Sequence, residues 1–144
     1  MNPYFEQMIL SASPIELVRL MYQRAVACVA DAREHLRAGR IMERGQAIAK
    51  AYAIIAELMA SLDREKAPDL ASNLRRLYSY LQQRLIEANL CQTDAPLAEA
   101  SCLLTTLADA WQAATPVASP ARTIVGTAPE NYRGAEISGA VVFA

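Results

Sequence analysis

Apolar residues recur at intervals of three and four along most of this 144-residue chain, the spacing of one face of an α-helix. Short polar segments divide the pattern into four stretches. The first runs from Ser13-Pro14 to Gly39, the second from Ile41 to Leu62, the third from Pro68 to the break at 92–96, and the fourth from there to Trp111. We therefore predict an all-α fold, an antiparallel up-down four-helix bundle over residues 13–114.

Residue types at the ends of these stretches support the same division. Ser13 and Glu16 have the spacing of a capping box, and Gly39 suits the left-handed residue that ends many helices. Pro68 suits a first helical turn, and Thr93 or Asp94 can cap the fourth helix. The positions expected to face the core are Val18, Tyr22, Ala25, Val29, Ala32, Leu36, Ile41, Gly45, Ile48, Tyr52, Ile55, Met59, Leu62, Leu70, Leu74, Leu77, Leu81, Leu85, Ala88, Leu97, Ser101, Leu104, Ala108 and Trp111. Tyr78, Tyr80 and Ile86 are expected beside that line.

Two segments flank the predicted bundle. Residues 1–12 carry five apolar side chains, Tyr4, Phe5, Met8, Ile9 and Leu10. They are expected either to cover an apolar groove or to form a hydrophobic staple on the first helix, and the residues alone leave both open. Residues 115–144 lose the helical period and hold three of the five glycines, so we expect an extended or disordered tail.

Composition excludes several classes of partner. The chain has 14 basic and 15 acidic residues, a net charge of −1, which disfavours nucleic acid and anionic lipid as main partners. No uncharged apolar run approaches the roughly 18–20 residues of a membrane span, and no secretory signal opens the chain. We therefore expect a cytoplasmic protein in which Cys28, Cys91 and Cys102 are reduced thiols.

Candidate catalytic residues are few. His35 is the sole histidine, and Ala32 stands where a Glu-x-x-His metal motif needs glutamate. No glycine-rich phosphate loop is present. We therefore predict no catalytic residues, no metal, no cofactor and no enzymatic activity. The alternative is a helical bundle that holds a small apolar ligand or cofactor and acts as an enzyme.

Four sequence strings carry a resemblance to a known family. They are "SASPIELVRLMYQRAV", "AYAIIAELMASLD", "LASNLRRLYSYLQQRLIEANL" and "LLTTLADAWQ". In order and spacing they resemble the FliS family of flagellar secretion chaperones over residues 2–114. The resemblance implies a cytoplasmic four-helix bundle that binds the C-terminal segment of flagellin, prevents premature polymerisation and aids flagellar export. Family members also contact other flagellar regulatory proteins. The turn "EKAPD" and the tail depart from the family pattern.

The resemblance and the apolar pattern together give a set of expected flagellin-binding residues. A stripe beside the core line of the second helix and the strongest family string in the third supply most of them, and the first segment is expected to act as a lid on the groove. The set is Tyr4, Ile9, Leu10, Ala51, Ile54, Leu58, Tyr78, Arg84, Ile86 and Asn89. A homodimer that shares empty apolar grooves is also compatible with this arrangement.

Overall fold

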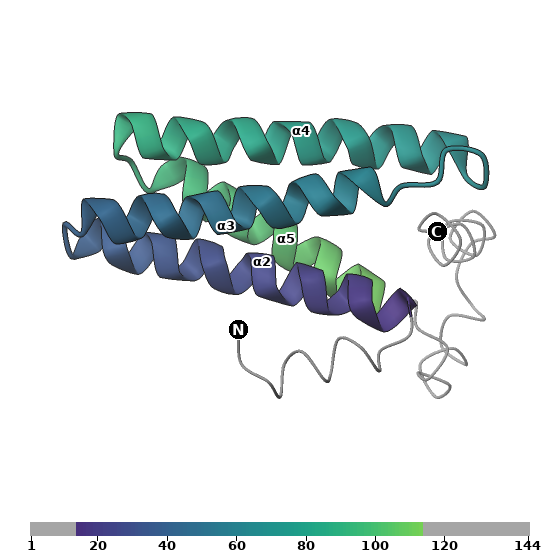
Figure 1. The fold of residues 1–144 in the computed structure, drawn as a ribbon, viewed down its shortest axis with the longest axis horizontal. Coiled ribbons are helices and arrows are strands. Elements are labelled where there is room, and N and C mark those ends of the chain that lie inside the picture. Colours follow the sequence, from purple (N-terminus) through teal and green to yellow (C-terminus); the bar gives the residue numbers. More distant parts are fainter. Residues whose placement is uncertain (1–13, 114–144) are drawn as a thin grey trace.

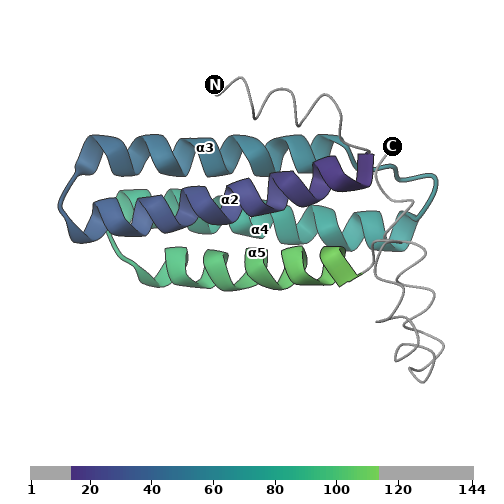
Figure 2. The same cartoon turned by 90° about the horizontal axis from the view of Figure 1, so that it is seen from below.

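The computed structural model describes residues 14–113, which form four helices (Figure 1). They are α2 (Pro14–Arg37), α3 (Ile41–Ala60), α4 (Pro68–Cys91) and α5 (Ala95–Ala113). Each helix packs against two others: α2 and α4 both lie between α3 and α5. Figure 2 shows the four running side by side with α4 behind α2. The predicted antiparallel four-helix bundle is confirmed.

Two of the predicted helix-end signals are present, and Ser13 of the predicted capping box lies outside the described residues. Gly39 has φ of +72°, the left-handed conformation that glycine adopts without steric penalty, and Pro68 occupies the first turn of α4. Gln92 also ends α4 in the left-handed region, with φ of 55°. At the start of α5, Arg33 donates to the two carboxylate oxygens of Asp94 from Nε (2.8 Å) and Nη2 (2.9 Å). This ion pair joins the end of α2 to the start of α5 and lowers the pKa of Asp94.

The core is built from one stripe of each helix, and alanines let the helices approach closely. Its fully buried members are Ala25, Val29, Ala32, Ala51, Ile55, Leu58, Tyr78, Leu81, Leu85, Ala88, Leu97, Ala100 and Leu104. Three expectations need correction. Tyr78 lies inside the core, because it comes four residues after Leu74 and three before Leu81 and so shares their buried face of α4. Ile41 and Tyr52 are not core residues, because they lie on the side of α3 where the bundle opens to solvent.

A pair of buried tyrosines connects the two helices that lie diagonally across the bundle. The hydroxyl groups of Tyr22 on α2 and Tyr78 on α4 form a hydrogen bond, and both side chains are almost fully buried. The Trp111 ring lies 6.3 Å from the Tyr22 ring, and its indole N–H donates to the Ile15 carbonyl at 3.3 Å. The pair therefore satisfies two polar groups inside an otherwise apolar core and fixes how α2 and α4 face each other.

We expect Tyr22→Phe and Tyr78→Phe each to lower the free energy of unfolding by about 1–3 kcal/mol, because each leaves one buried hydroxyl without its partner. The double variant should lose less than the sum of the two, since it removes both hydroxyls together. Urea unfolding followed by circular dichroism measures all four proteins. Additive losses would show that the hydroxyls do not depend on each other.

The same pair predicts an alkaline loss of stability. Burial raises the pKa of Tyr22 from 10.0 to about 12, and burial also raises the pKa of Tyr78. The unfolded chain releases these protons near pH 10 while the folded chain keeps them. The free energy of unfolding should therefore fall as the pH rises from about 10 towards 12. The double phenylalanine variant should show a shallower fall in the same unfolding experiment, and an equal slope would contradict this origin.

Candidate partner-binding surface

The large apolar side chains that residues 14–113 expose all lie on α3 and α4. Five of them are Ile41 (62% exposed), Met42 (71%), Tyr52 (37%), Ile86 (46%) and Leu90 (76%). The sixth in residues 14–113, Tyr80, hydrogen-bonds Glu99 on the other side of α4. We call the surface formed by the first five residues the α3–α4 edge. An exposed apolar set of this kind is typical of a surface that another molecule covers.

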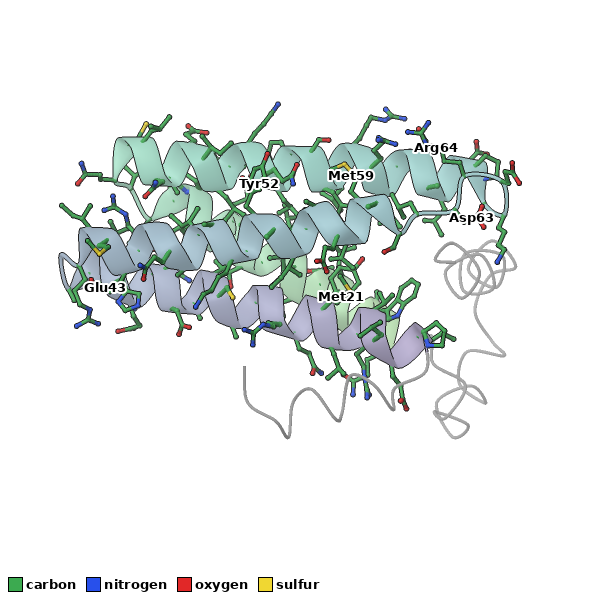
Figure 3. The ribbon with its side chains drawn as sticks, in the orientation of Figure 1. Met21, Glu43, Tyr52, Met59, Asp63 and Arg64 are labelled. Carbon is green, nitrogen blue, oxygen red and sulfur yellow. The ribbon has the colours of Figure 1, made fainter. Side chains whose placement is uncertain are left out.

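Two hydrogen-bonded contacts mark where α3 and α4 meet. The Gln82 side-chain amide donates to the Tyr52 carbonyl at 3.4 Å, and the Arg44 guanidinium donates to Asn89. Ile86 lies one helical turn from both Gln82 and Asn89, so it shares the α3-facing side of α4. Leu90 lies one turn beyond Ile86. On α3, Tyr52 is seen with Met59 along the side that runs beside α4 (Figure 3).

Arg44 is a buried residue of α3 that joins α3 to α4 beneath this edge. Its side chain is only 4% exposed, and it donates from Nε to Asn89 Oδ1 (3.2 Å) and from Nη2 to the Asn89 carbonyl (3.4 Å). The positive guanidinium therefore lies near the C-terminal end of α4, where the helix dipole favours a cation. Asn89 accepts both of these hydrogen bonds. The two residues therefore set the spacing of α3 and α4 where Ile41 and Leu90 are exposed.

Gly45 lies in the same edge and has no side chain to contribute. It follows Ile41 by one helical turn and is half-buried. A Cβ placed on it would lie 4.0 Å from Asn89 Oδ1, an ordinary van der Waals contact, and its backbone φ is negative. Alanine therefore fits at this position. Glycine inside a helix is roughly 0.5–1 kcal/mol less favourable than alanine, so packing within the described bundle does not explain this residue.

The structure distributes the predicted binding residues over several places. Ile86 and Asn89 lie at the α3–α4 edge, whereas Ile54 is half-buried on α3 and packs against the core. Ala51, Leu58 and Tyr78 have no exposed surface, so in this conformation they support the surface from inside. Tyr4, Ile9 and Leu10 lie outside the described residues. Contact of any of these ten residues with a partner stays a prediction.

Arg84 belongs to a polar cluster between α4 and α5. Its guanidinium contacts Glu87 at 2.7 Å and Glu99 at 3.1 Å. The hydrogen bond to Glu87 raises the pKa of Arg84, and the bond from Tyr80 to Glu99 raises the pKa of Tyr80. Arg84 and Glu87 are three residues apart on α4, and the cluster closes the α4–α5 side with charge where the α3–α4 edge is apolar.

Sequence reasoning missed Ile41, Met42, Tyr52 and Leu90 as exposed residues. Ile41 and Tyr52 continue the core period of α3, so the pattern alone places them inside. One signal was available for Ile41 and Met42, because they directly follow the Gly39 turn and a residue at the end of a bundle has fewer neighbours to cover it. Leu90 lies near the other helix end of the same region, two residues before the left-handed Gln92.

The described residues offer contact surface rather than reactive groups. Within residues 14–113 no three His, Cys, Asp or Glu side chains lie close enough to hold a metal ion. None of the four helices combines the length and the apolar character that crossing a bilayer requires. Cys28 is buried, which raises the pKa of its thiol. A rigid helical bundle with one apolar edge has the form of a protein that binds other polypeptides.

Comparison with known proteins identifies the family. Residues 1–118 match the family described as flagellar protein FliS. The flagellar secretion chaperone FliS of Salmonella typhimurium is 37% identical over 115 residues, which cover 79% of this chain and 85% of the relative. The flagellar secretion chaperone FliSB of Pseudomonas aeruginosa is 38% identical over 106 residues, 74% of this chain and 84% of the relative. The chain belongs to the FliS family, which confirms the resemblance, and this membership places it among flagellar secretion chaperones rather than enzymes.

Proposed function

We propose that this protein binds the C-terminal segment of flagellin in the cytosol, keeps it from polymerising prematurely and helps to deliver it for flagellar export. The α3–α4 edge carries the proposal, because a chaperone must cover apolar side chains of its client, the protein it protects, without performing chemistry. The family adds a flagellar role, since the curated relatives are named flagellar secretion chaperones. Helix-in-groove binding through apolar contacts is the mode that fits this surface.

The composition of the edge suits an unfolded client. Ile41, Met42, Ile86 and Leu90 are flexible or branched aliphatic side chains, and they contact an amphipathic helix without demanding a particular hydrogen-bond pattern. Tyr52 adds an aromatic ring with a polar end. A segment that folds on binding loses conformational entropy, so each buried apolar side chain of this edge must offset part of that cost.

We further propose that residues 1–12 act as a lid that covers apolar surface when no client is bound. The five apolar side chains of this segment are more than a hydrophobic staple needs. Because an exposed apolar surface favours aggregation, a covering segment within the same chain would protect the empty chaperone.

Replacing Ile86 with glutamate should weaken binding of a flagellin C-terminal peptide by at least about tenfold, because a carboxylate would be buried in an apolar contact without a partner. Isothermal titration calorimetry with the full-length chain measures this change. Thr105→Glu is the matched control: it adds the same charge to an exposed position of α5, away from the α3–α4 edge.

Circular dichroism should show the same helix content for both glutamate variants, since both positions are exposed. If the Ile86→Glu variant binds flagellin as tightly as Thr105→Glu does, the α3–α4 edge is not the client surface. A wild-type chain that does not bind flagellin at all contradicts the proposed function itself. Sedimentation of the mixtures separates a one-to-one complex from two copies that share the edge.

The lid predicts that Tyr4→Ala and Leu10→Asp change flagellin affinity more than they change helix content. Loss of a segment that competes for the client surface should shift the dissociation constant by roughly threefold or more, a difference of at least about 0.7 kcal/mol. Titration gives the affinity, and thermal melting followed by circular dichroism gives the stability. A lower melting temperature with unchanged affinity would instead assign the segment to a hydrophobic staple.

A further inference from the structure

Gly45 is the position in the α3–α4 edge that the described fold does not explain. Alanine would fit there without a clash, with an ordinary contact to Asn89, and would favour the helix. Glycine is nevertheless present in the middle of the exposed apolar residues, one turn after Ile41 and one turn before Ala49. The row of side chains along this edge therefore has a gap above the α3 backbone, next to Asn89.

We infer that Gly45 is the crossing point where a helix of the bound client packs directly against the α3 backbone. This inference rests on the proposed function and adds a residue and a binding geometry to it. Helices approach most closely where one of them has no side chain, because side-chain size at the contact sets the distance between the axes. Ile41 and Ile86 flank the crossing point on α3 and α4, and the Arg44–Asn89 hydrogen bonds hold the floor of the contact in place.

The dimensions of the edge fit one helix. From Ile41 to Tyr52 the surface follows twelve residues of α3, about 16 Å or three helical turns. Its exposed apolar area is on the order of a few hundred Å², below the roughly 800 Å² that each partner contributes to a standard protein–protein interface. A second copy of the bundle would not be held by this edge alone. A client helix with apolar residues at positions i, i+3 or i+4, and i+7 matches its length and width.

The crossing point also determines what the client must carry. A knob-like apolar side chain of the client helix enters the gap at Gly45, and its neighbours one turn away contact Ile41 on one side and Ile86 on the other. Any side chain added at position 45 occupies the same space. A side chain at position 45 therefore stabilises the helix but weakens client binding. A glycine with a purely structural role would not show these two opposite effects.

The test compares Gly45→Ala and Gly45→Leu with wild type in the full-length chain, titrated with the C-terminal segment of the flagellin. Gly45→Ala should raise the melting temperature by about 2–6 °C, because alanine favours the helix. It should weaken flagellin binding by roughly 5- to 100-fold, the scale of overpacking a close contact, and Gly45→Leu should weaken it further. Thr105→Ala is the matched control, since it also improves helix propensity but lies on α5, and it should leave the affinity unchanged.

Each outcome has one meaning. The crossing point is supported if Gly45→Ala is more stable than wild type but binds flagellin more weakly, and if Gly45→Leu binds more weakly still. Unchanged affinity of Gly45→Ala overturns it while the proposed function stands, because wild type still binds. A change in self-association without a change in flagellin affinity also overturns it, since a second copy then covers the edge. If wild type does not bind flagellin, the proposed function fails, and the crossing point, which rests on it, fails as well.

Discussion

Each helix of this bundle packs mainly against two neighbours, and that constraint determines which apolar residues are available to a partner. Two contacts bury only part of a helix's circumference, so a helix with apolar residues over a wider arc must expose the remainder. α3 and α4 both have this excess. Their shared side bears Ile41, Tyr52 and Ile86, whereas the α4–α5 side is closed by the ion pairs of Arg84. The α3–α4 edge is therefore exposed because each helix packs mainly against only two others. It lies between α3 and α4, and not between α4 and α5, because charged side chains cover the α4–α5 side.

The interior gives this edge its rigidity. Tyr22 and Tyr78 join the diagonal helices through their hydroxyls, and Arg44 joins α3 to α4 through Asn89. A surface that binds an unfolded segment benefits from being ordered before binding, because only the client then loses conformational entropy. Tyr78, Ala51 and Leu58 belong to this ordered interior. They are packed beneath the helices whose outer sides contact solvent.

The apolar period was enough to predict the four helices and most of the core. Residues spaced like Leu74, Leu81 and Leu85 can all be buried only if the helix turns that face towards the core of the bundle. It did not predict exposure near the helix ends. Ile41 and Tyr52 have the period of core residues, and only the position of α4 shows that they are at the margin. Tyr78 presents the opposite case: it was expected beside the stripe that contains Leu77 and Leu81, whereas the distant partner Tyr22 makes its burial favourable. Such pairings join residues far apart in the sequence, and no local pattern contains them.

Magnitudes limit how much of the client the α3–α4 edge can hold. A few hundred Å² of apolar surface is worth about 5–10 kcal/mol at roughly 25 cal/mol per Å². Ordering a disordered segment consumes about 2–5 kcal/mol of this, and the loss of translational and rotational freedom costs at least about 4 kcal/mol more. The edge alone therefore supports only weak binding of a three-turn helix. A client held tightly must therefore bury further apolar surface beyond this edge. Binding that is distributed over a long path and weak at each point would also allow the client to be released stepwise at the export apparatus.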